Sequence, residues 1–214
     1  MRGSLLDEKV ITSQACLEEG EAWLAAHDAR FAQALTLTGP LPLRLRPDGF
    51  EQLLNAIVSQ QVSVASARAI QERLRQAGMI TPDAILQSTE EALRGLGLSR
   101  QKASYAKALS GAGIDYDALR RLPTPEVIRI LVAVKGIGIW TAEIYAMFSL
   151  GRADVFAPDD LALQEGARLL FDLPDRPRPR ALRQMAESWS PYRSVAARLL
   201  WKYYHLCKQR EGIA

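Results

Sequence analysis

The sequence has very few of the side chains that bind metal ions. It contains two cysteines, Cys16 and Cys207, and two histidines, His27 and His205, far apart along the chain. These numbers exclude a four-thiolate iron–sulfur or zinc site and are too low for a histidine cluster that holds a metal. Without a secretion signal, the two cysteines are expected to be free thiols. We therefore expect no metal-dependent catalysis.

Long apolar runs are also missing. Charged residues interrupt every hydrophobic stretch, so we expect no membrane-spanning helix, and residues 1–10 lack the apolar core of a signal peptide. Both absences predict a cytoplasmic protein with no membrane partner. The net charge of +3 is compatible with a polyanionic partner but is weak evidence for one. Arginines gather in the last third of the chain, where a solvated basic helix face explains them equally well: Arg176, Arg178, Arg180, Arg183, Arg193 and Arg198.

Helical patterns fill most of the sequence. Apolar residues recur at helical spacing over residues 14–35, 50–78, 124–134 and 139–150, and the polar run at 59–63 interrupts the second of these. Thr124 is the expected N-cap of the third pattern, with Pro125 in its first turn. Trp140 and Ile144 are expected to begin an apolar stripe on the fourth. Residues 39–49 are expected to be an extended connector, and no alternation of strands and helices is present. The sequence predicts an all-α fold.

The stretch VKGIGIWTA at residues 134–142 places Gly136 and Gly138 between two helical patterns. Glycine permits a turn with positive φ and lets another molecule approach the main chain. The first N–H groups of the helix that follows have no partner within that helix, so they favour an anion such as a phosphate. A simple helical hairpin that needs glycine only in order to turn is the alternative. The apolar Ile137 between the glycines favours a packed hairpin, because a solvated loop does not need it.

Two adjacent carboxylates, Asp159 and Asp160, follow Pro158 and precede a helical pattern. A helix N-terminus explains one of them as a cap, and we expect Asp159 to be that cap. The second carboxylate therefore needs another role. The helix dipole and the first N–H groups favour a negative charge at this position.

The longer context resembles a known family. LVAVKGIGIWTAEIYAMFSLGRADVFAPDD, residues 131–160, resembles the helix-hairpin-helix–Gly/Pro–Asp signature of base-excision DNA glycosylases, and in particular their alkylpurine (3-methyladenine DNA glycosylase II) branch. AIVSQQVSVASARAI, GLSRQKASYAKALS and WSPYRSVAARLLWKYY also look like that branch. The resemblance covers roughly residues 12–208. It implies two helical subdomains that flank a cleft, formed by residues 12–48 with 153–214 and by residues 49–152, with the hairpin at about 124–150 and an N-terminal tail at 1–11.

The resemblance also implies the partner and the residue roles. The partner is damaged double-stranded DNA, bound by a monomer, at the nucleoid if the source is bacterial. Asp160 matches the catalytic aspartate, which stabilises positive charge on the sugar as the N-glycosidic bond breaks. Trp140 and Trp201 match the tryptophans of the base pocket, where aromatic faces favour electron-poor alkylated purines. The implied DNA contacts are Gln60, Gln61, Lys135, Gly136, Gly138, Thr141 and Arg193, with Gln61 filling the gap left by the flipped nucleotide.

Several positions depart from the pattern of relatives. Branches that also cleave the DNA backbone carry a lysine where this chain has Trp140, which implies an enzyme that leaves an abasic site. Ile144 stands where relatives often have Tyr in the pocket, and Gln61 stands where they often have Leu. The best-known member has an additional N-terminal β-rich domain that this chain is expected to lack, which implies a more open pocket.

No organic cofactor is implied. Main-chain carbonyls of Val132, Val134 and Ile137 are candidates to hold a structural cation in the hairpin. Two rival functions remain open at the level of sequence. A helix-hairpin-helix module that binds DNA without catalysis leaves Asp160 and the tryptophans without a role, and an oxidised-purine glycosylase/lyase lacks its lysine.

Overall fold

The computed structural model describes residues 8–211, and its named elements are all helices. The predicted all-α class is confirmed. Among the described residues, extended pairing is limited to an isolated bridge between Val10 and Arg152. The helices are α1 (Gln14–His27), α2 (Ala29–Thr38), α3 (Phe50–Ser59), α4 (Val64–Gln76), α5 (Pro82–Gln87), α6 (Glu90–Gly95), α7 (Arg100–Gly111), α8 (Tyr116–Arg121), α9 (Thr124–Val132), α10 (Ile139–Phe148), α11 (Leu161–Leu170), α12 (Pro179–Met185), the 3₁₀ helix η2 (Ala186–Trp189) and α13 (Arg193–Glu211).

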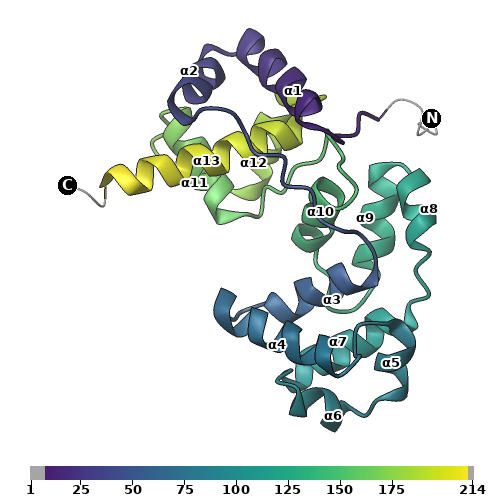
Figure 1. The fold of residues 1–214 in the computed structure, drawn as a ribbon. Helices are drawn as coiled ribbons and strands as arrows, with labels where there is room; N and C mark the ends of the chain where they lie inside the picture. Colours follow the sequence, from purple (N-terminus) through teal and green to yellow (C-terminus); the bar gives the residue numbers. More distant parts are fainter. Residues whose placement is uncertain (1–7, 212–214) are drawn as a thin grey trace. The chain divides into compact units, whose positions relative to one another are not determined.

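The chain divides into two compact units (Figure 1). Unit 1 combines residues 1–45 with residues 146–214, and unit 2 consists of residues 46–145. Of the predicted N-terminal tail at residues 1–11, residues 1–7 lie outside the described residues. Its last part pairs with the segment after α10, because Ile11 donates its N–H to the carbonyl of Gly151 at 2.7 Å and Lys9 accepts from Ala153 at 3.0 Å.

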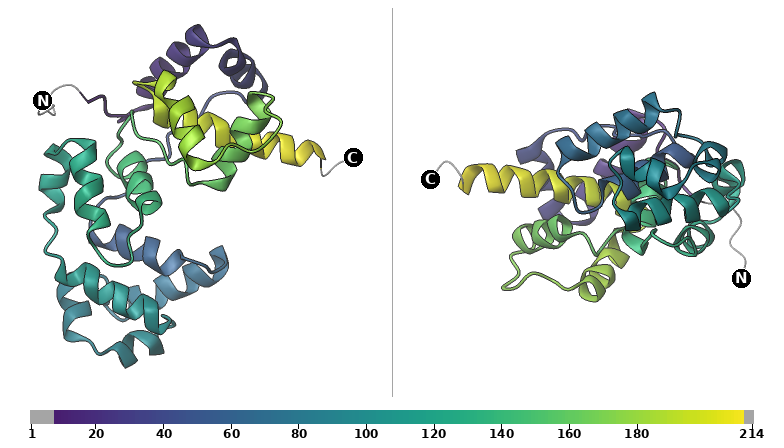
Figure 2. Two further views of the ribbon diagram at one scale, coloured as in Figure 1. Left: turned by 180° about the vertical axis from the view of Figure 1, so that it is seen from behind. Right: turned by 90° about the horizontal axis from the view of Figure 1, so that it is seen from below.

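Unit 1 is built around α13. This helix packs against α1, α2 and α11, and Figure 2 shows it running the length of this part of the chain. Aromatic side chains fill the space beside it: Phe31 and Phe156 meet Trp189 edge-on, with ring centroids 5.5 and 5.4 Å away, and Phe171 stacks on it at 5.7 Å. Burial of these rings fixes α2, η2 and the residues before α11 to one another.

Unit 2 packs α3, α5 and α6 against α7. The buried residues of α3 include Leu53, Leu54 and Ile57, and those of α7 include the small residues Ala103 and Ala106. The predicted interruption at residues 59–63 is confirmed, because α3 ends at Ser59 and α4 begins at Val64 with Ser63 as its N-cap.

Two expectations about helix limits are wrong, and one helix was not predicted. Residues 14–35 form two helices, because Asp28 breaks the pattern and caps α2 by accepting the N–H of Arg30 at 2.9 Å. Helix α8 has no predicted counterpart, since its six residues show too little periodicity for detection. Thr124 is the first helical residue instead of the N-cap, a position that Pro123 occupies without a side-chain hydrogen bond.

Candidate functional site

Asp160 is the N-cap of α11. Its Oδ1 accepts the backbone N–H of Ala162 at 2.9 Å and that of Leu163 at 3.0 Å. The expectation that Asp159 caps this helix is therefore wrong: Asp159 is exposed, and the cap lies one residue later because the extended backbone conformation falls at Asp160. The carboxylate predicted to be catalytic is thus held by the first turn of its own helix.

Trp201 on α13 makes a third contact with the same carboxylate oxygen. Its indole Nε1–H donates to Oδ1 of Asp160 at 3.0 Å. The two helices approach closely because α11 carries Gly166, where an added Cβ would lie 2.6 Å from the carbonyl oxygen of Leu200. Phe148 stacks on the indole with ring centroids 5.8 Å apart. The structure therefore brings together two of the predicted site residues, Asp160 and Trp201, in unit 1.

The hairpin has the predicted form. Helix α9 ends at Val132, α10 begins at Ile139, and Ile137 between the glycines is buried. Gly136 has φ of +98°, and an added Cβ would lie 2.3 Å from the ring of Tyr105. The fold itself therefore requires glycine there. Gly138 differs, because an added Cβ would meet no described atom within 4 Å. Packing does not explain Gly138, which leaves open space in front of the N-terminus of α10.

Two side-chain hydrogen bonds hold the end of α3 and the loop that follows it, one to the hairpin and one from α7. Gln60 donates its side-chain N–H to the carbonyl of Gly136 at 2.9 Å. Lys102 on α7 is buried and donates to the carbonyl of Val58 at 2.7 Å, which satisfies an acceptor at the C-terminal end of α3. Burial lowers the pKa of Lys102. Sequence reasoning gave no role to Lys102 or Tyr105, although both lie in the quoted segment GLSRQKASYAKALS.

Gln61 has an unusual backbone conformation. Its φ is +53°, in the left-handed region that residues other than glycine seldom adopt, and its side chain is exposed. The neighbouring apolar residues Val62 and Val64 are 39% and 69% exposed. A cavity of about 530 Å³ lies between this loop, the start of α7 and the hairpin. Such strain in an exposed loop is typical of segments that contact a ligand.

The predicted site residues on the first turns of α10 differ in how far they are exposed to solvent. Trp140 is 42% exposed, so the expectation that it begins a buried stripe is wrong. Thr141, predicted to contact DNA, is 6% exposed, and Ile144 is half-buried. Tyr145 does not replace the missing pocket tyrosine within unit 2, because it is buried and its hydroxyl accepts the N–H of Gly49 at 2.8 Å.

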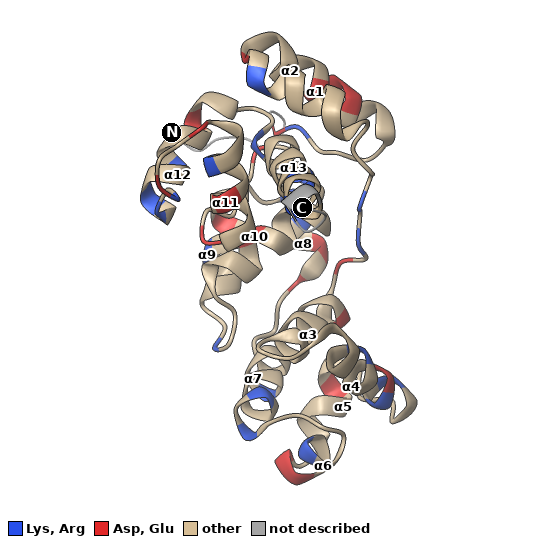
Figure 3. Cartoon of the chain, turned by 90° about the vertical axis from the view of Figure 1, so that its left-hand side faces the viewer, with Lys and Arg blue, Asp and Glu red and all other residues tan. Residues whose placement is uncertain are grey.

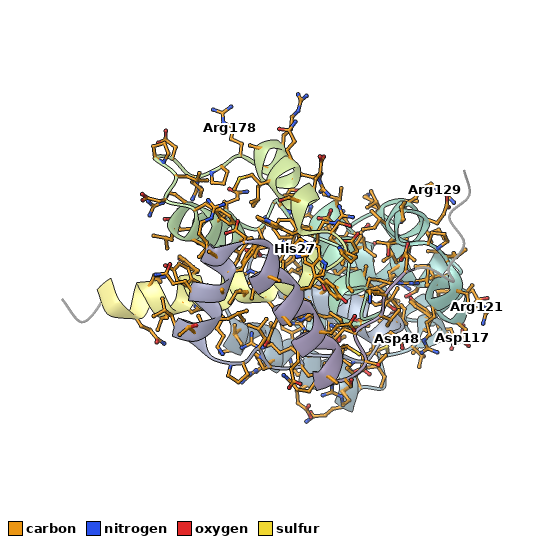
Figure 4. All side chains as sticks on the ribbon, turned by 90° about the horizontal axis from the view of Figure 1, so that it is seen from above. His27, Asp48, Asp117, Arg121, Arg129 and Arg178 are labelled. Carbon is orange, nitrogen blue, oxygen red and sulfur yellow. The ribbon has the colours of Figure 1, made fainter. Side chains whose placement is uncertain are left out.

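The arginines of the C-terminal third have different surroundings. Arg193 donates to both carboxylate oxygens of Asp154, with Nε to Oδ1 at 2.7 Å and Nη2 to Oδ2 at 2.8 Å, and this raises the pKa of Arg193. Arg198 is buried. By contrast, Arg176, Arg178 and Arg180 are exposed; Figure 3 shows blue segments at α12, and the side chain of Arg178 extends from the ribbon in Figure 4. Lys135 at the hairpin is exposed as well.

Within residues 8–211, no group of three or more His, Cys, Asp or Glu side chains could hold a metal ion. The predicted cation site in the hairpin would use carbonyl oxygens instead. One of them, that of Val134, accepts the N–H of Ile137 at 3.0 Å and keeps a second lone pair. Helices in the described part of the chain are too short or too polar to cross a bilayer.

Comparison with known proteins shows the family. Residues 54–191 match the family described as HhH-GPD superfamily base excision DNA repair protein, and the chain belongs to this family. The predicted family is thereby confirmed. The DNA-3-methyladenine glycosylase 1 of Schizosaccharomyces pombe is 32% identical over 207 residues, which cover 91% of this chain and 90% of that protein.

Two solved structures resemble the fold. The 3-methyladenine DNA glycosylase of S. pombe, in complex with abasic DNA, superposes with a TM-score of 0.75 at 33% identity and covers 86% of this chain and 95% of its own. The DNA-3-methyladenine glycosidase of Bacillus halodurans superposes with a TM-score of 0.79 at 35% identity, covering 86% of this chain and 88% of its own.

Proposed function

We propose that the protein is a monofunctional DNA glycosylase that hydrolyses the N-glycosidic bond of alkylated purines in double-stranded DNA and leaves an abasic site. The observation that carries the proposal is the carboxylate of Asp160, fixed by two backbone amides and by the indole of Trp201. The names of the similar proteins, DNA-3-methyladenine glycosylases, support alkylated purines of the 3-methyladenine and 7-methylguanine type as substrates. The enzyme acts as a monomer without an organic cofactor.

Asp160 stabilises the positive charge that develops on the sugar and orients the attacking water. Cleavage of an N-glycosidic bond makes the sugar cationic in the transition state, and a carboxylate held in a fixed position needs no reorganisation to stabilise it. Alkylation at N3 or N7 already gives the purine a positive charge, so the base leaves without strong protonation. The carboxylate therefore supplies the main chemical assistance that this substrate class needs.

The hairpin binds the phosphate backbone. The first N–H groups of α10 follow Gly138 in the chain, and a Cβ added at Gly138 would meet no described atom within 4 Å, so a phosphate has room to approach them. The enzyme extrudes the damaged nucleotide, and the loop carrying Gln61 enters the gap that it leaves. Flipping costs a few kcal/mol and is cheapest at a weakened base pair, which contributes selectivity. Trp140 and Trp201 provide the aromatic faces that accept the extruded base.

Strand cleavage is not part of the proposed reaction. A lyase forms a covalent Schiff base with the sugar through an amine, and the position where related lyases carry lysine is Trp140. Lys135 stands on the α9 side of the turn and serves phosphate binding. Thr141, which is buried, and Arg193, which is paired to Asp154, complete the proposed set of DNA contacts.

Incubation with methylated duplex DNA and, separately, with an 8-oxoguanine duplex tests the proposal. Release of free methylated base together with sites that break only after alkali treatment is the expected result. Direct nicking of the 8-oxoguanine duplex would identify a lyase, and binding without base release would identify a DNA-binding module. Either of these outcomes contradicts the proposal. Parallel measurement of 3-methyladenine, 7-methylguanine and hypoxanthine release defines the preferred base.

A further inference from the structure

A second cavity lies within unit 1, on α13 beside Trp201. Its volume is about 320 Å³, roughly ten water molecules at ~30 Å³ each. Three of its lining residues are cationic, namely Arg44, Arg198 and Lys202, and three carry aromatic rings, namely Phe148, Trp201 and His205. All of its lining residues belong to unit 1, and one of them, Phe148, is the last residue of α10. The glycine turn of the hairpin and the loop that carries Gln61 belong to unit 2.

Arg198 is the most unusual of these residues because it is a buried cation. Only 5% of it is exposed, and its guanidinium lies over the ring of Phe148, 4.6 Å from the ring centroid. Its Nη1 donates to the carbonyl and the hydroxyl of Ser194 at 3.0 and 2.9 Å, and Nη2 donates to the carbonyl of Met147 at 3.3 Å. Its Nε is buried without a hydrogen-bond partner.

None of these three cations is paired with a carboxylate among residues 8–209. Lys202 donates only to the carbonyls of Gly39 and Pro40. Burial, and next the charge of Arg44, lower the pKa of Arg198 to about 10. The other deeply buried arginine of unit 1, Arg152, has Glu8 at 3.3 Å. Buried charges in proteins are normally paired, so a cavity lined by these cations suits an anion.

We propose that this cavity binds a phosphate-class oxyanion. Arginine presents a planar fork that suits phosphate oxygens, and Arg44 and Arg198 repel each other until an anion lies between their charges. The volume exceeds that of a phosphate alone, and the rings of Phe148 and Trp201 add flat apolar walls. The ligand is therefore a phosphate carried by a nucleotide unit. Its source is either a phosphodiester of DNA or a free nucleotide, and only the DNA source rests on the proposed function.

Thermal unfolding in phosphate tests this proposal without any measurement of base excision. We expect inorganic phosphate, or adenosine monophosphate, at several times its Kd to raise the Tm of the wild-type protein by about 2–4 °C relative to chloride at equal ionic strength. The rise should disappear in Arg44→Gln, an exposed position where the fold is not at risk, and in Arg198→Met, which exchanges the buried cation for an apolar chain. Arg94→Gln removes an exposed arginine from unit 2 and should keep the full rise.

The absence of a phosphate-specific rise in the wild-type protein, or an equal rise in wild type and Arg44→Gln, would contradict the proposal. The source of the phosphate follows from a second measurement, the salt dependence of binding to undamaged duplex. A DNA phosphodiester at this site predicts that Arg44→Gln lowers the slope of log K against log salt by about 0.9, whereas a free nucleotide predicts an unchanged slope. Asp160→Asn should keep the increase in Tm that phosphate causes. Failure of the proposed glycosylase activity and failure of the proposed phosphate site can therefore be distinguished.

Discussion

The N-termini of α10 and α11 are built in opposite ways. Helix α11 follows Asp160, whose carboxylate accepts two of the first backbone N–H groups of its own helix. Helix α10 follows Gly138, which has no side chain and so offers no acceptor to the amides behind it. The first four N–H groups of any helix have no partner within it, and at α11 the side chain of Asp160 accepts two of them, whereas Gly138 brings no side chain that could do so at α10.

This difference separates a chemical role from a binding role. At α11 the amides serve to fix a negative charge, which suits stabilisation of a cationic sugar. The amides at the start of α10 have the same polarity, but the glycine in front of them brings no carboxylate, so they suit a phosphate. The two helix starts also belong to different units, since Asp160 lies in unit 1 and Gly138 in unit 2. Variants at the two starts should therefore affect turnover and DNA affinity separately.

Asp160→Asn should have the largest effect. The amide still caps α11, so the fold is kept, but the negative charge is lost, and we expect kcat for base release to fall by about 10²–10⁴-fold. Single-turnover excision from methylated duplex measures this, and duplex affinity should change by less than about twofold, well within the ~0.5 kcal/mol typical of surface substitutions. The matched control is Asp159→Asn, which removes the same charge from the exposed neighbour. Equal losses in the two variants would contradict the assignment of Asp160.

Trp201→Phe tests the third contact to the carboxylate. It keeps an aromatic ring but removes the indole N–H that donates to Oδ1 of Asp160. A hydrogen bond to a charged group contributes about 1.5–3 kcal/mol, so a loss of about tenfold or more in kcat is expected. The comparison of kcat with KM is decisive, because a purely structural or stacking role would change KM instead. Trp23→Phe, on α1 in the same unit, should leave both parameters unchanged.

The sequence predicted the fold class and the position of the hairpin, because these depend on helical periodicity and on glycines with strong local preferences. The catalytic role of Asp160 came from the family resemblance and stays a prediction. The sequence placed the cap on the wrong aspartate because two adjacent carboxylates fit the same local pattern, and only the backbone conformation distinguishes them. The hydrogen bond from Trp201 joins residues 41 positions apart, and the contact between Tyr105 and Gly136 depends on how helices pack. Local periodicity holds no information on either.

Gly138→Ala and Gly136→Ala form a matched pair at the start of α10. Gly136→Ala meets both a positive φ and the ring of Tyr105, so it should lower the free energy of unfolding by about 2–5 kcal/mol. Gly138→Ala meets no described atom and should change stability by less than about 1 kcal/mol. If phosphate approaches this position, Gly138→Ala should weaken duplex binding by about three- to tenfold with kcat preserved, ~1 kcal/mol as for a lost hydrogen bond.

Chemical denaturation and a binding titration measure the two effects of this pair. Duplex affinity in Gly138→Ala equal to that of the wild type would show that the glycine serves only the turn. The same result would remove the proposed phosphate site from the N-terminus of α10 while leaving the carboxylate at α11 unaffected.

Arg178→Gln should have the smallest effect, because its charge acts through solvent and not through the ordered amides of α10. Arg178 is exposed beside prolines that hold the chain rigid, and its side chain extends from the ribbon in Figure 4. If it contacts a phosphate, the salt slope of duplex binding falls by about 0.9 and kcat is unchanged. Arg129→Gln is the control, since Arg129 is engaged by Glu126 at 2.8 Å, and its slope should match the wild type. Equal slopes in all three proteins would show that Arg178 does not contact a phosphate. Phosphate binding would then be restricted to the hairpin and other cations, and the start of α10 would remain the main contrast to the carboxylate at the start of α11.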